Sequence, residues 1–215
     1  MKLKPRFAFA VSVVALATLF SDAPRAYSLL GYTWPQSTMP YYVNPANMDR
    51  PLSAIEPAIR VGADAWRLQS GASFQFAFAG LTSQTTNTND GINLVMFRNA
   101  SSGSALATTY SWFSGTRVID ADIVFWDAGY KFVTGTSGCS GGFYIEDVAT
   151  HEFGHALGLG HSTVAGATMY PSISTCSQQS RLLDADDIAA VRALYPPTAL
   201  PPAPPVGVRL VRPGL

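Results

Sequence analysis

The chain has 215 residues, and its 14 basic side chains balance 14 acidic ones. A balanced charge creates no basic field for nucleic acid, so we expect no nucleic-acid partner. The length suffices for one domain with a hydrophobic core.

The first 28 residues have the pattern of a secretory signal peptide. A basic start precedes an apolar run of 14 residues from Phe7 to Phe20, and small residues follow at Ala26 and Ser28. This run is too short to span a bilayer comfortably. We expect cleavage after Ser28 or, alternatively, after Ala26, with an uncleaved anchor as the third alternative. The mature protein is expected to be secreted, extracellular or periplasmic in a Gram-negative bacterium, without stable membrane insertion.

Residues 29–197 are expected to form one α+β domain. A helix is predicted from about Ser53 to Ser70, since apolar residues recur there at helical spacing. Ser53 and Glu56 are predicted to form its capping box. Strands are predicted at Met39–Asn44, around Phe74, Phe76 and Phe78, and at Ile92–Phe97, Ala105–Trp112 and Arg117–Trp126.

The segment from His151 to Ser162 reads His-Glu-Phe-Gly-His-Ala-Leu-Gly-Leu-Gly-His-Ser and contains all three histidines of the chain. A helix advances about 100° per residue, so His151 and His155 share one face and Glu152 lies beside them. Two imidazoles and one carboxylate can therefore converge on one point.

The chain can then return a third histidine to this point. Gly158 and Gly160 can adopt positive φ, which lets the backbone leave the helix and bring back His161. Zinc bound by three imidazoles keeps a fourth position for water, which is typical of a catalytic site. Glu152 can accept the proton of that water as general base.

The run from His161 to Pro171, with Ser162 directly after the last histidine, resembles the metzincin zinc metallopeptidases, and within them the matrixin branch. The resemblance implies an α+β fold with a twisted five-stranded mixed sheet, an active-site helix and a C-terminal helix. It also implies that Met169 is the Met-turn residue beneath the metal.

The resemblance implies a cleft as well. Leu106 and Ala107 would lie on the strand that borders it, where substrate backbone adds as an extra strand. Pro171, Ser172 and Ile173 would line the pocket beside the zinc.

Two further metal questions follow from the resemblance. Matrixins usually place a histidine of a second, structural zinc site at the position of Thr108, and no histidine remains here, so we expect a single zinc. Matrixins bind calcium near Asp120 and Asp122, which share one face of their strand. Calcium is left open here, with a solvated pair or a capping role as alternatives.

The end of the domain resembles the closing helix of matrixins. Asp184 is its expected N-cap, and Asp186 and Asp187 would brace the active site from below. Residues 198–215 are rich in proline and are expected to form an extended tail.

Cys139 and Cys176 lie before the zinc helix and after the Met-turn. A disulfide between them fits a secreted protein and would clamp both sides of the cleft. A free thiol, or a cysteine that blocks the zinc, is the alternative.

The sequence therefore predicts a secreted, monomeric, zinc-dependent endopeptidase that acts on proteins or peptides. The alternative from another class is a catalytically silent zinc-binding adhesion or interaction module on the same fold.

Overall fold

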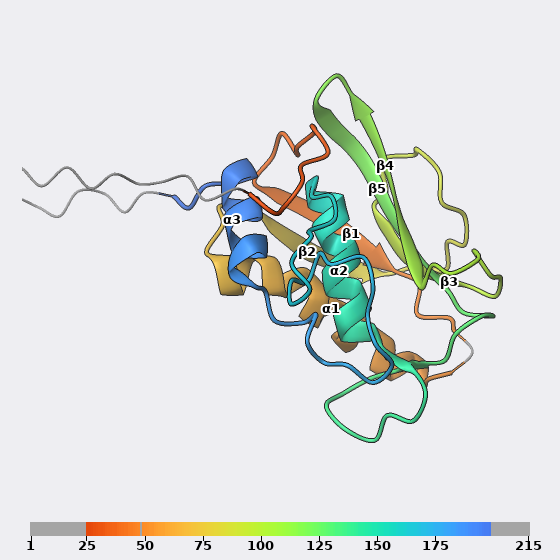
Figure 1. Ribbon diagram of the computed structural model, residues 1–215. Helices are drawn as coiled ribbons and strands as arrows, with labels where there is room; N and C mark the ends of the chain where they lie inside the picture. Colours follow the sequence, from red (N-terminus) through yellow and green to blue (C-terminus); the bar gives the residue numbers. More distant parts are fainter. Residues whose placement is uncertain (1–24, 48, 199–215) are drawn as a thin grey trace, which may run out of the picture.

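The computed structural model describes residues 25–47 and 49–198 (Figure 1). The predicted signal peptide and proline-rich tail therefore lie almost entirely outside the described residues. Within the described ranges, every helix is too short or too polar to cross a bilayer.

Five strands form one mixed sheet in the order β2-β1-β3-β5-β4. Strands β1, β2, β3 and β5 are parallel, and β4 runs antiparallel to β5 at the edge. This confirms the predicted α+β class and the five-stranded mixed sheet. The strands are β1 (Thr38–Val43), β2 (Gln75–Leu81), β3 (Leu94–Arg98), β4 (Ala107–Ser114) and β5 (Arg117–Trp126).

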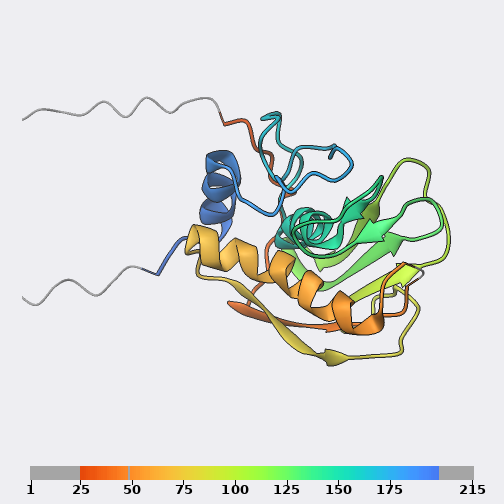
Figure 2. The ribbon, with the colours of Figure 1, turned by 90° about the horizontal axis from the view of Figure 1, so that it is seen from below.

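Three helices lie on one side of the sheet (Figure 2): α1 (Leu52–Ser70), α2 (Ile145–Leu157) and α3 (Ala185–Leu194). Helices α1 and α2 approach closely at Gly62, where an added Cβ would lie 2.6 Å from the Cβ of Ala149. The glycine is therefore required for this contact. It belongs to the apolar face of α1, whose residues Ile55, Ile59 and Trp66 are buried as their spacing predicted.

The predicted capping box of α1 is wrong. The helix begins at Leu52 and its N-cap is Pro51, with no hydrogen bond from a side chain to the first turn. Ser53 therefore lies inside the first turn, where its hydroxyl is past the capping position.

Two strands begin two residues later than predicted. Strand β3 begins at Leu94, because the side chain of Asn93 donates to the carbonyl of Pro40 (3.0 Å) and accepts from the amide of Ala121 (2.9 Å). Strand β4 begins at Ala107, because Ala105 donates instead to Ser102 in a turn.

One small sheet was not predicted. Strands β6 (Phe132–Val133) and β7 (Phe143–Tyr144) form a parallel pair that leads directly into α2. Two-residue strands carry too little periodicity to be recognised in a sequence.

The two faces of the main sheet are covered differently. Ala121 and Ile123 of β5 belong to the main core with the helices, whereas Val124 and Trp126 belong to a second, smaller cluster. Side chains alternate along a strand, so Asp120 and Asp122 lie on the same face as the smaller cluster. We call the two sides the helix face and the loop face.

Candidate metal centre and active site

Helix α2 presents His151 and His155 on one face and ends at Gly158, whose φ of 101° is left-handed. The chain then turns and returns His161, so that ligand atoms of the three histidines lie within 4.8 Å of one another. The Nε2 atoms of His151 and His155 are 3.1 Å apart. Zinc bonds of 2.0–2.1 Å in a tetrahedron separate two ligands by about 3.3 Å. The spacing therefore fits a shared zinc ion.

Backbone carbonyls orient two of these rings. Nδ1 of His151 lies 2.7 Å from the carbonyl of Thr168, and Nδ1 of His155 lies 2.8 Å from the carbonyl of Leu159. Each Nδ1 therefore carries the proton, which leaves the lone pair of Nε2 for a metal.

Burial also sets the charge of the two rings. It lowers the pKa of both His151 and His155 to about 4. Both imidazoles are thus neutral at pH 7, the form that binds metals. Within residues 25–47 and 49–198, the histidine trio is the one group of three or more His, Cys, Asp or Glu side chains close enough to share an ion.

Glu152 is buried beside the histidines, 6% exposed, and burial raises the pKa of its carboxyl. Its Oε2 accepts a hydrogen bond of 2.7 Å from the hydroxyl of Thr109 on β4. The sequence analysis did not identify Thr109. The available signal was its position two residues after Ala107, on the same face of the strand.

Met169 is buried, 1% exposed. It packs against α2 at Gly154, where an added Cβ would overlap the sulfur of Met169 and lie 2.6 Å from the Trp66 ring. Gly154, within the histidine motif, is therefore a second residue that the sequence analysis missed.

Asp187 at the start of α3 connects the segment of Thr168 and Met169 to the histidines. Its carboxylate accepts from the amides of Thr168 (2.7 Å) and Met169 (3.0 Å). Thr168 in turn offers its carbonyl to His151. Asp184 caps the helix as predicted, and Asp187 completes a capping box with it.

Asp186 makes a separate contact with the third-histidine segment. It accepts a hydrogen bond of 2.6 Å from the Ser162 hydroxyl and one of 3.2 Å from the Tyr27 amide. The neighbouring Ser28 hydroxyl donates to the carbonyl of His161 (2.8 Å), and its carbonyl accepts from Gly160 (2.9 Å). The segment that precedes β1 therefore holds the loop that carries His161.

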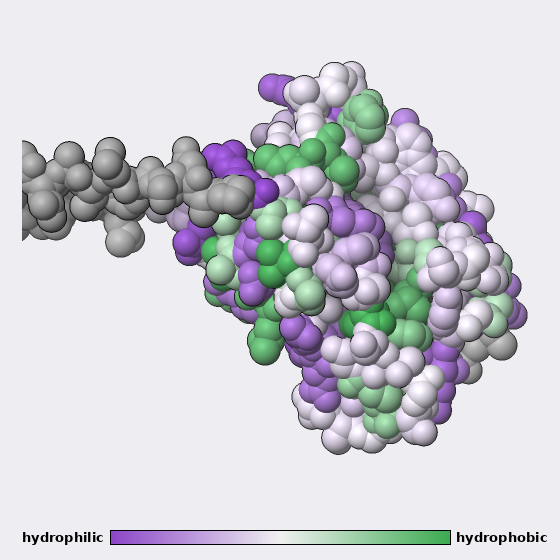
Figure 3. Space-filling model, in the orientation of Figure 1, coloured by the Kyte–Doolittle hydropathy of each residue, from purple (hydrophilic) through white to green (hydrophobic). Residues whose placement is uncertain are grey.

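The molecule is hollowed near the centre of the face in Figure 3, and hydrophobic residues gather there. A cavity of about 650 Å³ opens over the histidines and Glu152. All residues proposed from the sequence for substrate binding line it: Leu106, Ala107, Pro171, Ser172 and Ile173. Further apolar or aromatic residues line the cavity: Tyr130, Phe143, Val148 and Tyr170.

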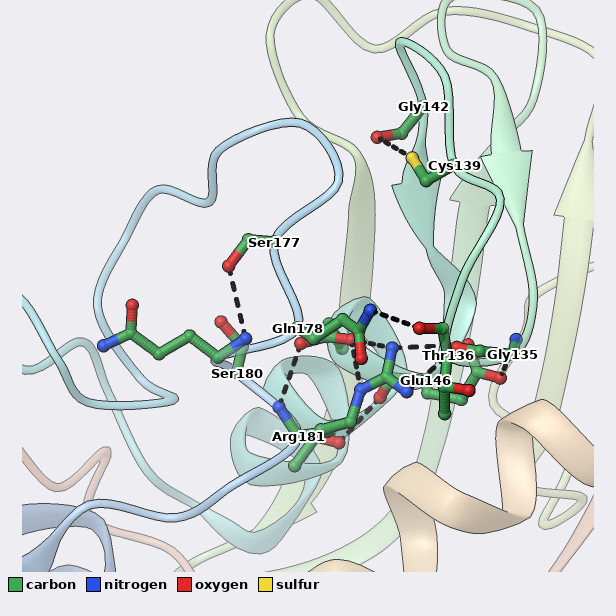
Figure 4. A network of polar contacts seen from close by, with 12 residues as sticks. Gly135, Thr136, Cys139, Gly142, Glu146, Ser177, Gln178, Ser180 and Arg181 are labelled. Atoms are coloured by element: carbon green, nitrogen blue, oxygen red, sulfur yellow. Dashed lines mark hydrogen bonds and ion pairs between the residues drawn. The ribbon is translucent and has the colours of Figure 1, made fainter.

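The loop after the Met-turn is fixed by polar contacts (Figure 4). Arg181 donates to the buried carboxylate of Asp147 (2.7 Å) and to the carbonyl of Gly135 (3.0 Å). Gln178 donates to the carbonyl of Thr136 (2.8 Å). These contacts join the loop to α2 and to the segment before it.

A disulfide joins the same two segments. Cys139 and Cys176 are bonded, with an Sγ–Sγ distance of 2.05 Å, as the sequence predicted. Neither sulfur is therefore a ligand of the histidine site.

On the loop face, Asp120 and Asp122 serve as acceptors for backbone amides. Asp120 accepts from Asp90 (2.8 Å) and Gly91 (3.0 Å), and Asp122 accepts from Thr88 (3.0 Å) and Leu94 (2.9 Å). These bonds engage three of the four carboxylate oxygens and anchor the loop before β3. Calcium at this pair stays a prediction, which a thermal shift on adding calcium would test.

Comparison with known proteins extends beyond the motif. The model of the matrixin family matches residues 33–196. Matrix metalloproteinase-20 of Homo sapiens is 28% identical over 200 residues, which are 90% of this chain and 36% of that protein. The hatching enzyme of Paracentrotus lividus is 52% identical over 62 residues, 29% of this chain and 10% of that protein. Matrilysin of Mus musculus is 45% identical over 60 residues, 28% of this chain and 23% of that protein.

The chain thus spans about a third of the length of the human relative and a smaller share of the other two. The family match covers most of the chain and contains the sheet, the three helices and the histidine cluster. The chain therefore belongs to the matrixin family of peptidases.

Proposed function

We propose that this protein is a secreted zinc-dependent endopeptidase that hydrolyses internal peptide bonds of extended substrates. The observation that carries the proposal is the buried carboxylate of Glu152 beside three convergent histidines. A site that only binds metal has no need of a proton acceptor in this position.

His151, His155 and His161 are the proposed ligands of one zinc ion. When bound, zinc supplies Lewis-acid activation of a water molecule and of the peptide carbonyl. Glu152 accepts a proton from the attacking water and then delivers it to the nitrogen of the leaving amine. The raised pKa of its buried carboxyl favours holding that proton between the two steps.

Substrate is proposed to bind along β4. This strand lies at the edge of the sheet, so its outer backbone groups are available for pairing. Ala107 and Thr109 line the same cavity as Pro171 and Ile173, which supports binding of an extended chain between strand and loop. The mainly apolar wall favours protein or peptide substrates with apolar side chains at the cleft.

Secretion is part of the proposal, and the contacts before β1 bear on the signal cleavage site. Tyr27 and Ser28 bond to Asp186 and to the loop of His161. Cleavage after Ser28 would remove these contacts, whereas cleavage after Ala26 would keep them. We therefore favour Tyr27 as the first mature residue, which N-terminal sequencing of secreted protein would test.

The competing function is a silent zinc-binding module. Gelatin zymography with and without a chelator separates the two. The proposal expects a cleared band that the chelator abolishes and added zinc restores. Purified protein that holds zinc but cleaves neither gelatin nor a mixed peptide library would instead support the binding module.

A further inference from the structure

Thr109 occupies a particular position on the edge strand. Successive side chains of β4 point to opposite faces of the sheet. The hydroxyl of Thr108 accepts from the indole nitrogen of Trp126 (2.9 Å) on the loop face. Thr109 therefore points to the helix face, where its hydroxyl meets Glu152.

The hydroxyl of Thr109 is placed between two oxygens of the same residue. Oγ1 lies 2.7 Å from Oε2 of Glu152 and 3.0 Å from its backbone carbonyl oxygen. A hydroxyl has one proton, and a charged carboxylate oxygen is a stronger acceptor than a carbonyl. The shorter distance to Oε2 agrees with donation to the carboxylate.

We propose that Thr109 is a positioning residue that fixes the Glu152 carboxylate for proton transfer. The inference rests on the proposed role of Glu152. The terminal torsion of a glutamate is soft, so a carboxylate without a fixed partner samples many orientations. A hydrogen bond to Oε2 selects one orientation and commits Oε1 to the attacking water.

The same bond can persist through the proposed proton cycle. The proton that leaves the water binds Oε1, the electron pair of the water oxygen forms the bond to the peptide carbon, and the π electrons of the C=O bond move onto the carbonyl oxygen. Oε2 then becomes the carbonyl oxygen of a carboxylic acid and still accepts from Thr109. When the C=O bond re-forms and the C–N bond breaks, the nitrogen keeps the electron pair of that bond and takes the proton from Oε1. The carboxylate is thereby restored without a change of rotamer.

The test replaces Thr109 in the full-length protein and uses a fluorogenic peptide substrate. Thr109→Val keeps the branched shape and removes the hydroxyl, and we expect kcat to fall about tenfold, a part of the usual contribution of a general base. KM and zinc content should remain unchanged, because the zinc ligands and the backbone groups of β4 that would pair with substrate are not altered. Thr109→Ser should restore kcat to within about threefold of the original, since it returns the hydroxyl.

Ser111→Ala is the matched control. Ser111 lies two residues further on the same strand face, and its buried hydroxyl has no hydrogen-bond partner among the described residues. Its removal should leave kcat unchanged. If Thr109→Val folds poorly, the pair Thr109→Ser and Thr109→Ala provides the same comparison, with kcat expected to be higher for serine.

Three results would overturn the inference: an unchanged kcat in Thr109→Val, an equal loss in the variants with and without a hydroxyl, or a loss explained by missing zinc. Glu152→Gln distinguishes this failure from failure of the proposed function. An inactive Glu152→Gln with a fully active Thr109→Val refutes only the role of Thr109, whereas an active Glu152→Gln refutes the proposed mechanism itself.

Discussion

The helix face and the loop face of the sheet each carry a cluster of side chains that could bind a metal, and the two clusters differ in what surrounds them. On the helix face, His151 and His155 bond to the backbone only through Nδ1, and their Nε2 atoms point to a shared space. On the loop face, Asp120 and Asp122 accept four backbone amides.

The difference shows why residue type alone does not define a site. The histidines are satisfied on one side only, and a cavity opens over the other. Three of the four carboxylate oxygens already have donors from their own chain, so a cation would have to compete with those donors. The first cluster is therefore suited to catalysis, and the second to holding a loop.

The strongest test of this contrast is at the helix face. Glu152→Gln should retain zinc and lose at least ~10²-fold in turnover, because the proton acceptor is lost and every ligand remains. His155→Ala should instead lose the metal, since it removes a ligand. Turnover would be measured with a peptide substrate, and zinc content by mass spectrometry, on the same samples. Near-normal turnover of a zinc-loaded Glu152→Gln would contradict the assignment.

Removal of the disulfide tests whether the same covalent bond stabilises both the cleft and the histidine cluster. The double variant Cys139→Ser, Cys176→Ser should lower the free energy of unfolding by at most about 4 kcal/mol, since the unfolded chain regains loop freedom. The bond joins the loops beside the cleft and contacts no histidine. Urea unfolding and peptide kinetics should therefore show lower stability and a raised KM, with zinc still bound; loss of zinc would contradict this separation.

Asp187 connects α3 to the Met-turn and should show an intermediate effect. Asp187→Asn replaces one acceptor oxygen with a donor that faces backbone amides, so we expect a loss of about 2 kcal/mol in the free energy of unfolding. The carbonyl of Thr168 should also move from His151, which weakens zinc binding by roughly tenfold. Competition with a zinc chelator would measure this. Glu56→Gln on α1, far from Met169 in sequence and paired at the surface with the exposed Arg60, serves as the control.

The smallest expected effect on activity is at the loop face. Burial raises the pKa of Asp122 to about 7, well above its usual value. Between about pH 4 and pH 7 the unfolded chain has released this proton and the folded protein retains it, so stability falls as the pH rises through this window and levels off above it. Asp122→Asn should remove most of that fall, which amounts to about 1.4 kcal/mol for each pH unit of the window.

Urea unfolding at about pH 5 and about pH 8 would compare the stability of the original protein with that of Asp122→Asn. Equal pH dependence in the original and in Asp122→Asn would show that the carboxylate does not retain its proton on folding. Zinc content should be the same in both, since the pair lies on the other face from the histidines.

Much of the fold and of the metal centre could be predicted because the determining patterns are local. The spacing of His151, Glu152 and His155 places them on one helix face without any tertiary contact. The acidic start of α3 predicted its cap at Asp184 in the same way. The predicted limits of β5 agree with the structure, because the turn at Gly115 and Thr116 separates it from the preceding strand.

Other features depend on residues distant in the sequence, and only the tertiary structure decided them. Thr109 meets Glu152 because the edge strand lies beside α2, 43 residues later in the chain. Gly154 is required because Met169 and Trp66 both fill the space of its missing side chain. The sequence by itself predicted which side chains can bind zinc, since the helical repeat brings His151 and His155 together and the glycine after the helix lets the chain return His161. Which groups orient them, and which oxygens of the acidic pair are bonded to their own backbone, depends on how the chain folds back, since hydrogen bonds form wherever packing brings donors and acceptors together.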